Sequence, residues 1–139
     1  YIHQQGPAPQ QLEFDGVGHV TASVGRPIGP CGFSSLAATP EWLGSDMAKA
    51  FMRAYRKTRA YINETPAAEI AAAEASFFPD VDLQVLTNTI EFYQGLGCWS
   101  RHVEITKEAY EVTLDVFDHV GRLTRRHAYE DVCAPPPAG

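Results

Sequence analysis

The chain has 139 residues, of which 45% are hydrophobic and 20% are charged, a composition typical of one globular domain or a large piece of one rather than of a disordered chain. Eleven Lys and Arg against 17 Asp and Glu give a formal net charge of −6, which disfavours a nucleic-acid partner because the phosphate backbone is also negative. No apolar run approaches the roughly 20 residues of a membrane-spanning helix. The chain begins at Tyr1 without a signal peptide, so we expect a processed product or a fragment.

Residues 1–38 are rich in Gly and Pro, which excludes a long helix there. Two stretches in this part, residues 19–24 and 31–36, are predicted to be short strands from their β-branched and aromatic residues. A turn-rich link is predicted between them at residues 25–30, and a helical turn at residues 10–14.

From Thr39 the hydrophobic pattern changes to a helical period, which continues to residue 133. Threonine or aspartate caps, two of them followed by proline, predict helix starts near residues 39, 65, 82 and 106, and glycines predict helix ends near residues 97 and 121. Residues 134–139 are predicted to be a flexible Pro-rich tail. The predicted helix that follows residue 45 has an apolar stripe made of Met47, Ala50, Phe51, Ala54, Tyr55, Thr58, Tyr61 and Ile62.

The three cysteines, Cys31, Cys98 and Cys133, have no Cys-x-x-Cys spacing, so a structural zinc site has no support. An odd number of thiols cannot all pair within one chain, and we expect buried, reduced cysteines, although the sequence does not indicate the redox compartment. Cys98 and His102 are four residues apart, but they follow a predicted helix end, whose dipole favours a neutral thiol. No catalytic residue, metal ligand or cofactor is therefore expected.

The most suggestive polar run lies at the start of the chain. His3, Gln4, Gln5 and Gly6 combine an imidazole, two amides and a Gly-Pro turn, groups that can line a small-molecule cleft. We predict these four residues as ligand-binding residues. An ordinary loop near a chain terminus is the alternative interpretation.

The order of several segments resembles the C-terminal part of bacterial substrate-binding proteins of the NMT1/THI5-like group, which includes the sulfonate- and nitrate-type receptors of ABC importers. The resemblance covers most of this chain but only about half of a family member. It is carried by residues 18–25, 29–34, 38–43, 69–71, 77–79, 93–99 and 121–124.

The resemblance implies part of a two-lobed α/β clamp of the type II periplasmic-binding-protein kind, in which this chain is mostly helical with two short strands near its N-terminus. Residues 1–38 would end one lobe and cross over, and residues 39–133 would pack on the first lobe. It also implies a small organic ligand, a membrane permease as indirect partner, a periplasmic or extracytoplasmic location, and no chemistry of its own. The exposed faces would be covered by a missing N-terminal half or by self-association.

Two alternatives stay open. One is an enzyme on the same scaffold, such as a relative of the THI5-like pyrimidine synthases or of aromatic-acid decarboxylases. The other is an independent helical interaction domain. Strand pairing at residues 19–24 and 31–36 distinguishes the receptor from the helical domain.

Overall fold

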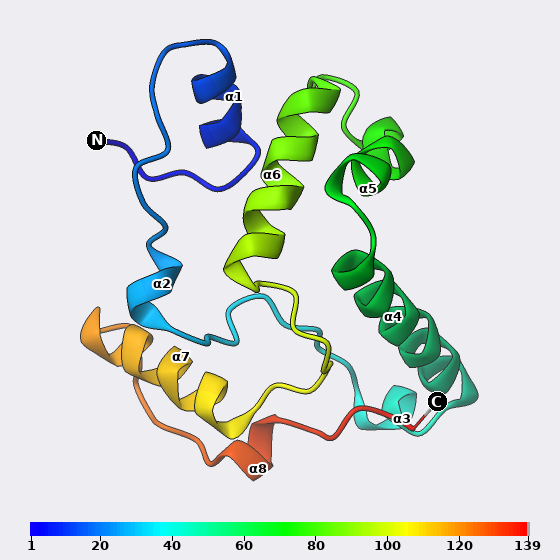
Figure 1. Ribbon diagram of the computed structural model, residues 1–139. Coiled ribbons are helices and arrows are strands. Elements are labelled where there is room, and N and C mark those ends of the chain that lie inside the picture. The colour runs from blue at the N-terminus through cyan, green and yellow to red at the C-terminus, as the bar shows by residue number, and fades with distance from the viewer. Residues whose placement is uncertain (139) are drawn as a thin grey trace. The chain divides into compact units, whose positions relative to one another are not determined.

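The regular structure of this chain is helical throughout the part that a computed structural model describes, residues 1–138 (Figure 1). The helices are α1 (Ala8–Phe14), α2 (Gly25–Ile28), α3 (Pro40–Leu43), α4 (Asp46–Glu64), α5 (Ala67–Glu74), η1 (Ala75–Phe77, a 3₁₀ turn), α6 (Leu83–Leu96), α7 (Lys107–His119) and α8 (Tyr129–Val132).

Helix ends follow the capping chemistry that the sequence predicted. The side chains of Thr39, Asp82 and Thr106 each accept a hydrogen bond from a backbone N–H in the first turn of α3, α6 and α7. Gly97 ends α6 in the left-handed conformation, at a φ of 69°. The start of α5 differs from the prediction, because Pro66 precedes it without a side-chain cap.

The two predicted strands are wrong. Residues 19–24 and 31–36 form no β-ladder with any described residue. Their backbone groups bond elsewhere: Val20 donates its N–H to the carboxylate of Glu13, and Gly32 donates its N–H to a carbonyl of α7. A strand requires a partner strand, and two short strands make no stable sheet by themselves. Residues 1–138 thus contain the predicted helices without the predicted sheet.

Two compact units divide the chain. The first comprises residues 1–22 and 58–101, and the second comprises residues 23–57 and 102–138. Each unit is therefore built from two segments that are distant in the sequence.

The core of the first unit lies between α5 and α6. Alanines on α5 let the two helices approach closely, and Ala71 is completely buried. Helix α1 also contacts α6, and Val85 on α6 is completely buried. The central hydrophobic cluster consists of Ile70, Ala71, Leu86 and Ile90, with Ala67, Val81 and Trp99 packed against it.

A side-chain amide on α6 fixes the junction between α4 and α5. The Nε2 group of Gln94 donates to the carbonyls of Ile62, at 2.7 Å, and of Thr65, at 3.0 Å. These carbonyls lie where the helical ladder of α4 ends, so they need partners other than the helix itself. Gln94 supplies them and holds the start of α5 against α6.

The second unit has a smaller core. Ala48 and Met52 on α4 and Tyr110 on α7 are buried. The Tyr110 ring meets the ring of Tyr129 edge to face, with centroids 5.7 Å apart, and its hydroxyl donates to the carbonyl of His127 at 2.9 Å. These contacts attach α8 and the preceding loop to α7.

The apolar stripe predicted for α4 is not the buried side of this helix, because none of its residues is fully buried. Met47, Phe51 and Tyr61 are 68%, 41% and 41% exposed, whereas the buried residues of the helix are Ala48 and Met52. Ala48 and Met52 both lie outside the predicted stripe, so a neighbouring side of α4 is the one that packs against the rest of the unit. No helix in residues 1–138 has both the length and the hydropathy needed to cross a bilayer.

Gly97→Ala should destabilise the first unit by about 1 kcal/mol, because alanine has a strained backbone at this positive φ. No atom lies within 4 Å of the added Cβ, so the cost is conformational and not a clash. Gly95→Ala is the matched control, since Gly95 lies inside α6 with equally open space; it should stabilise by roughly 0.5–1 kcal/mol. Urea unfolding of both variants measures the difference, and equal effects would contradict this account of the helix end.

Candidate functional site

The N-terminal segment is attached to α6 by a close backbone approach at Gly6. The Gly6 N–H donates to the hydroxyl oxygen of Tyr93 at 2.9 Å. A Cβ at Gly6 would lie 2.8 Å from Cγ2 of Thr89 and 3.0 Å from the Tyr93 hydroxyl, so only glycine fits here without displacement. The sequence marked Gly6 as a candidate binding residue, and the structure places it at this helix contact.

The other predicted ligand-binding residues lie at the surface. His3, Gln4 and Gln5 are exposed, while Gly6 is half-buried. No hydrogen bond joins the side chains of His3, Gln4 and Gln5 within the described part of the chain. A ligand-binding role for the four residues stays a prediction.

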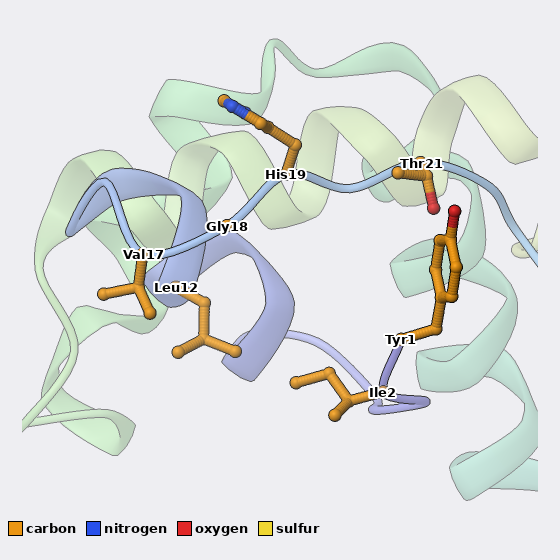
Figure 2. Close-up of a pocket in the computed structure, with 7 residues that line it drawn as sticks. All are labelled: Tyr1, Ile2, Leu12, Val17, Gly18, His19 and Thr21. Atoms are coloured by element: carbon orange, nitrogen blue, oxygen red, sulfur yellow. The ribbon is translucent and has the colours of Figure 1, made fainter.

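A hollow next to this segment is the main candidate for a ligand site. It is open, has a volume of about 300 Å³, and is formed by the ends of the N-terminal segment and α1 together with the loop after α1. Figure 2 shows the apolar side chains of Ile2, Leu12 and Val17 on one side of the loop, whereas the imidazole of His19 extends to the other side. Its lining residues are Tyr1, Ile2, Leu12, Val17, Gly18, His19 and Thr21.

The hollow offers apolar contact with few polar groups. Of its polar side chains, His19 lies 3.7 Å from the carboxylate of Glu13, and both are largely exposed. Such a site can hold an apolar part of a small molecule but has few groups that fix its orientation. Sequence reasoning missed Leu12 and Val17, because single apolar residues in a Gly-rich segment have no pattern that indicates a cavity.

A buried side-chain amide lies near Gly6. Gln10 on α1 is 6% exposed, and its Oε1 atom is buried without a hydrogen-bond partner among the described residues. The same atom would lie 3.2 Å from a Cβ at Gly6. Buried polar atoms normally have hydrogen-bond partners, so the Gln10 Oε1 atom is an exception to that rule.

The cysteines do not form a nucleophilic site. Cys31 and Cys98 are exposed, Cys133 is half-buried, and all three are free thiols. Loss of solvation raises the pKa of the Cys98 and Cys133 thiols above the ordinary value, which lowers the thiolate fraction at neutral pH. The prediction of buried thiols is thus wrong for Cys31 and Cys98, and the raised pKa gives Cys98 no activation.

One arginine after α7 forms ion pairs with the acidic face of that helix. Arg126 donates to the carboxylates of Glu111, at 3.1 Å, and Asp115, at 2.7 Å, and lies 3.6 Å from that of Asp118. The hydrogen bonds to the carboxylates of Asp115 and Glu111 raise the pKa of the Arg126 guanidinium. Within residues 1–138, no group of three or more His, Cys, Asp or Glu side chains is arranged to hold a metal ion.

A protein of Bacillus subtilis (strain 168) described as "Putative binding protein YtlA" is similar to this chain, with 25% identity over 134 residues. The similar region covers 95% of this chain and 40% of the Bacillus protein. The chain therefore spans less than half the length of this relative. No protein-family model matches the chain, and no solved structure matches it.

Tyr93→Phe should destabilise the first unit by about 1 kcal/mol, because the partly buried Gly6 N–H loses its acceptor while the ring contact with Trp99 is kept. Tyr61→Phe is the matched control: Tyr61 is 41% exposed, and its change should stay within about 0.5 kcal/mol. Chemical denaturation measures both variants. Equal stability of the two would contradict a structural role for the Tyr93 hydroxyl.

Iodoacetamide should alkylate Cys98 more slowly at neutral pH in the folded chain than in the denatured chain. The raised pKa leaves less thiolate, the reactive form, and the rate should rise only at higher pH than for an unfolded cysteine. Peptide mapping after timed quenching measures each thiol separately. Alkylation that is faster in the folded state would instead indicate an activated nucleophile.

Proposed function

We propose that this chain is part of a solute-binding receptor that clamps a small organic ligand between two lobes and delivers it to the permease of an ABC importer. The main support for the proposal is that nearly the whole chain is similar to 40% of a longer Bacillus protein, which is described as a putative binding protein. The resemblance to the NMT1/THI5-like group supports the finer assignment, including the importer, the permease and a periplasmic or extracytoplasmic location.

Unpaired segments support the proposal physically. Residues 17–24 and 31–36 have no ladder partner within residues 1–138, yet they expose large apolar side chains. Val17, Phe33 and Leu36 are 73%, 68% and 63% exposed. Exposed apolar segments of this kind are typical of a surface that another part of the protein covers. In a complete receptor, the rest of the protein would cover these apolar side chains.

An independent helical interaction domain is the second candidate function. The observation that favours it is that all regular structure within residues 1–138 is helical. On this view the exposed apolar residues are docking sites for other proteins, and no strands form at residues 19–24 or 31–36 in any assembly.

Ligand binding by the complete protein tests the receptor proposal. A full-length protein that contains this chain should be screened by thermal shift against organic sulfonates. A ligand at 100 times its Kd should stabilise the complete protein by about 2.7 kcal/mol, whereas the chain by itself should show no shift. Circular dichroism should also gain a strand signal in the complete protein.

Substitution at the N-terminal segment then tests the predicted site. The triple variant H3A/Q4A/Q5A should weaken ligand binding at least about tenfold, as expected when several polar contacts are lost. Gln84→Ala is the control, because Gln84 is an exposed amide on α6. Unchanged affinity in the triple variant would remove these residues from the site. A complete protein that binds no small molecule and gains no strands would favour the helical interaction domain.

A further inference from the structure

The chain that follows α7 turns back and runs along that helix toward its start (Figure 1). Arg126 donates to the carboxylate of Asp115, in the second half of α7, at 2.7 Å. The Tyr129 hydroxyl donates to the carbonyl of Ile105, just before the helix, at 2.6 Å. Later residues of this segment thus bond to earlier residues of the α7 region. Residues 122–130 are therefore antiparallel to α7, and both belong to the second unit.

Two contacts at the start of α7 hold this returning segment in place. The buried ring of Tyr110 meets the ring of Tyr129 edge to face, with centroids 5.7 Å apart. Lys107 lies 3.4 Å from the carboxylate of Glu130, and both side chains are largely exposed. Because an exposed ion pair contributes little to stability, the tyrosine pair is the stronger of these two attachments.

Beyond α8 the chain leaves α7 and reaches α4. The Nη2 group of Arg56, on α4, donates to the carbonyl of Pro137 at 3.0 Å. Arg56, Pro136 and Pro137 are all half-buried. Prolines have no backbone N–H, so residues 135–137 can form backbone hydrogen bonds only through their carbonyls. A charged guanidinium is a strong donor to such a carbonyl, and Arg56 therefore attaches this segment to α4.

The same arginine also acts on the residues just before α7. The pKa of Glu104 is lowered mainly by a hydrogen bond from its own backbone N–H, and the positive charge of Arg56 adds a smaller effect of the same sign. An interaction between charges falls with distance, so Arg56 lies near the start of α7 as well as beside Pro137. The segment after α8 thus reaches α4 where that helix and the start of α7 are neighbours.

We propose that residues 120–137 form a strap that closes the second unit, and that Arg56 is a latch that can release the strap end, residues 131–137. In the closed state the strap end joins α7 to α4. In the open state the strap end is free, while residues 122–130 stay on α7 through the tyrosine pair and Arg126. The flexible Pro-rich tail that the sequence predicts is then the open state. The proposal goes beyond the receptor function and does not depend on it.

Arg56→Gln tests the latch on the full 139-residue chain by ¹⁵N relaxation. An order parameter of about 0.85 marks a rigid backbone, and a value below about 0.6 marks a flexible one. At the Ala134 amide the order parameter should exceed about 0.7 in the unmodified chain and fall below about 0.6 in the variant, because the strap end loses its bond to α4. The Tyr129 amide should stay near about 0.85 in both.

Lys57→Gln is the matched control, because it removes the same charge at the next residue of α4, whose side chain is exposed. The order parameter at Ala134 should stay above about 0.7 in this variant. Far-UV circular dichroism checks that each variant keeps its helices.

A double-mutant cycle separates a latch from a merely structural arginine. In the full chain, Arg56→Gln should raise the unfolding equilibrium constant about tenfold, as expected for the loss of a hydrogen bond to a charged group. In a chain that ends at Cys133, the same substitution should change this constant less than about threefold, because the Pro137 carbonyl is already absent. Urea denaturation of the four chains measures both effects.

A strap end that becomes mobile only in Arg56→Gln, with a smaller cost of that substitution in the shortened chain, would support the latch. An order parameter below about 0.6 at Ala134 in the unmodified chain would overturn it, whatever the variants do. Equal costs of Arg56→Gln in the two backgrounds, or a rigid Ala134 in that variant, would also contradict it. Release of residues 122–130 together with the strap end would exclude a latch that acts on the end alone.

Discussion

The contact between α5 and α6 is the constraint on which the first unit depends. Helix α5 offers mainly alanines, and this lack of bulk lets the two backbones approach until Ile70 and Ala71 fit against Leu86 and Ile90. A large-to-small change in such a cluster costs roughly 2–5 kcal/mol, a large part of the stability of a small domain. The Gln94 amide then positions the end of α4, and Tyr93 positions the N-terminal segment. Both side chains come from α6, so its placement fixes the surroundings of the candidate site.

Local chemistry was predicted well from the sequence. The caps at Thr39, Asp82 and Thr106 and the left-handed Gly97 depend only on neighbouring residues, and the structure has them where they were expected. The hydrophobic pattern of residues 19–24 and 31–36 could not decide whether they form strands. A strand forms only beside a partner strand, and the pattern of one segment does not show whether a partner is present. The buried side of α4 was likewise ambiguous, since apolar residues extend around more than one side of that helix. Which side of α4 is buried depends on the elements that pack against the helix.

In the candidate site, too, some features follow from neighbouring residues and others depend on the fold. Gly6 was singled out for its place in a polar run, yet its structural importance comes from Tyr93 and Thr89, more than eighty residues later. The hollow involves Leu12 and Val17, which no local pattern connects to the start of the chain. Contacts between residues that are distant in the sequence can be identified only once the fold is known. The polar character of residues 3–5, by contrast, is fully visible in the sequence and is kept at the surface.

Helix α6 packs against other segments on more than one side, and this restricts which substitutions it can accept during evolution. Val85 and Leu86 are adjacent in the chain and both buried, as are Thr89 and Ile90. Leu86 and Ile90 pack in the cluster with α5, whereas Thr89 lies beside Gly6 of the N-terminal segment. A rotation of α6 that improves one contact must worsen the other. We therefore expect changes in the buried residues of α6 to be accompanied by changes in the segments that pack on it.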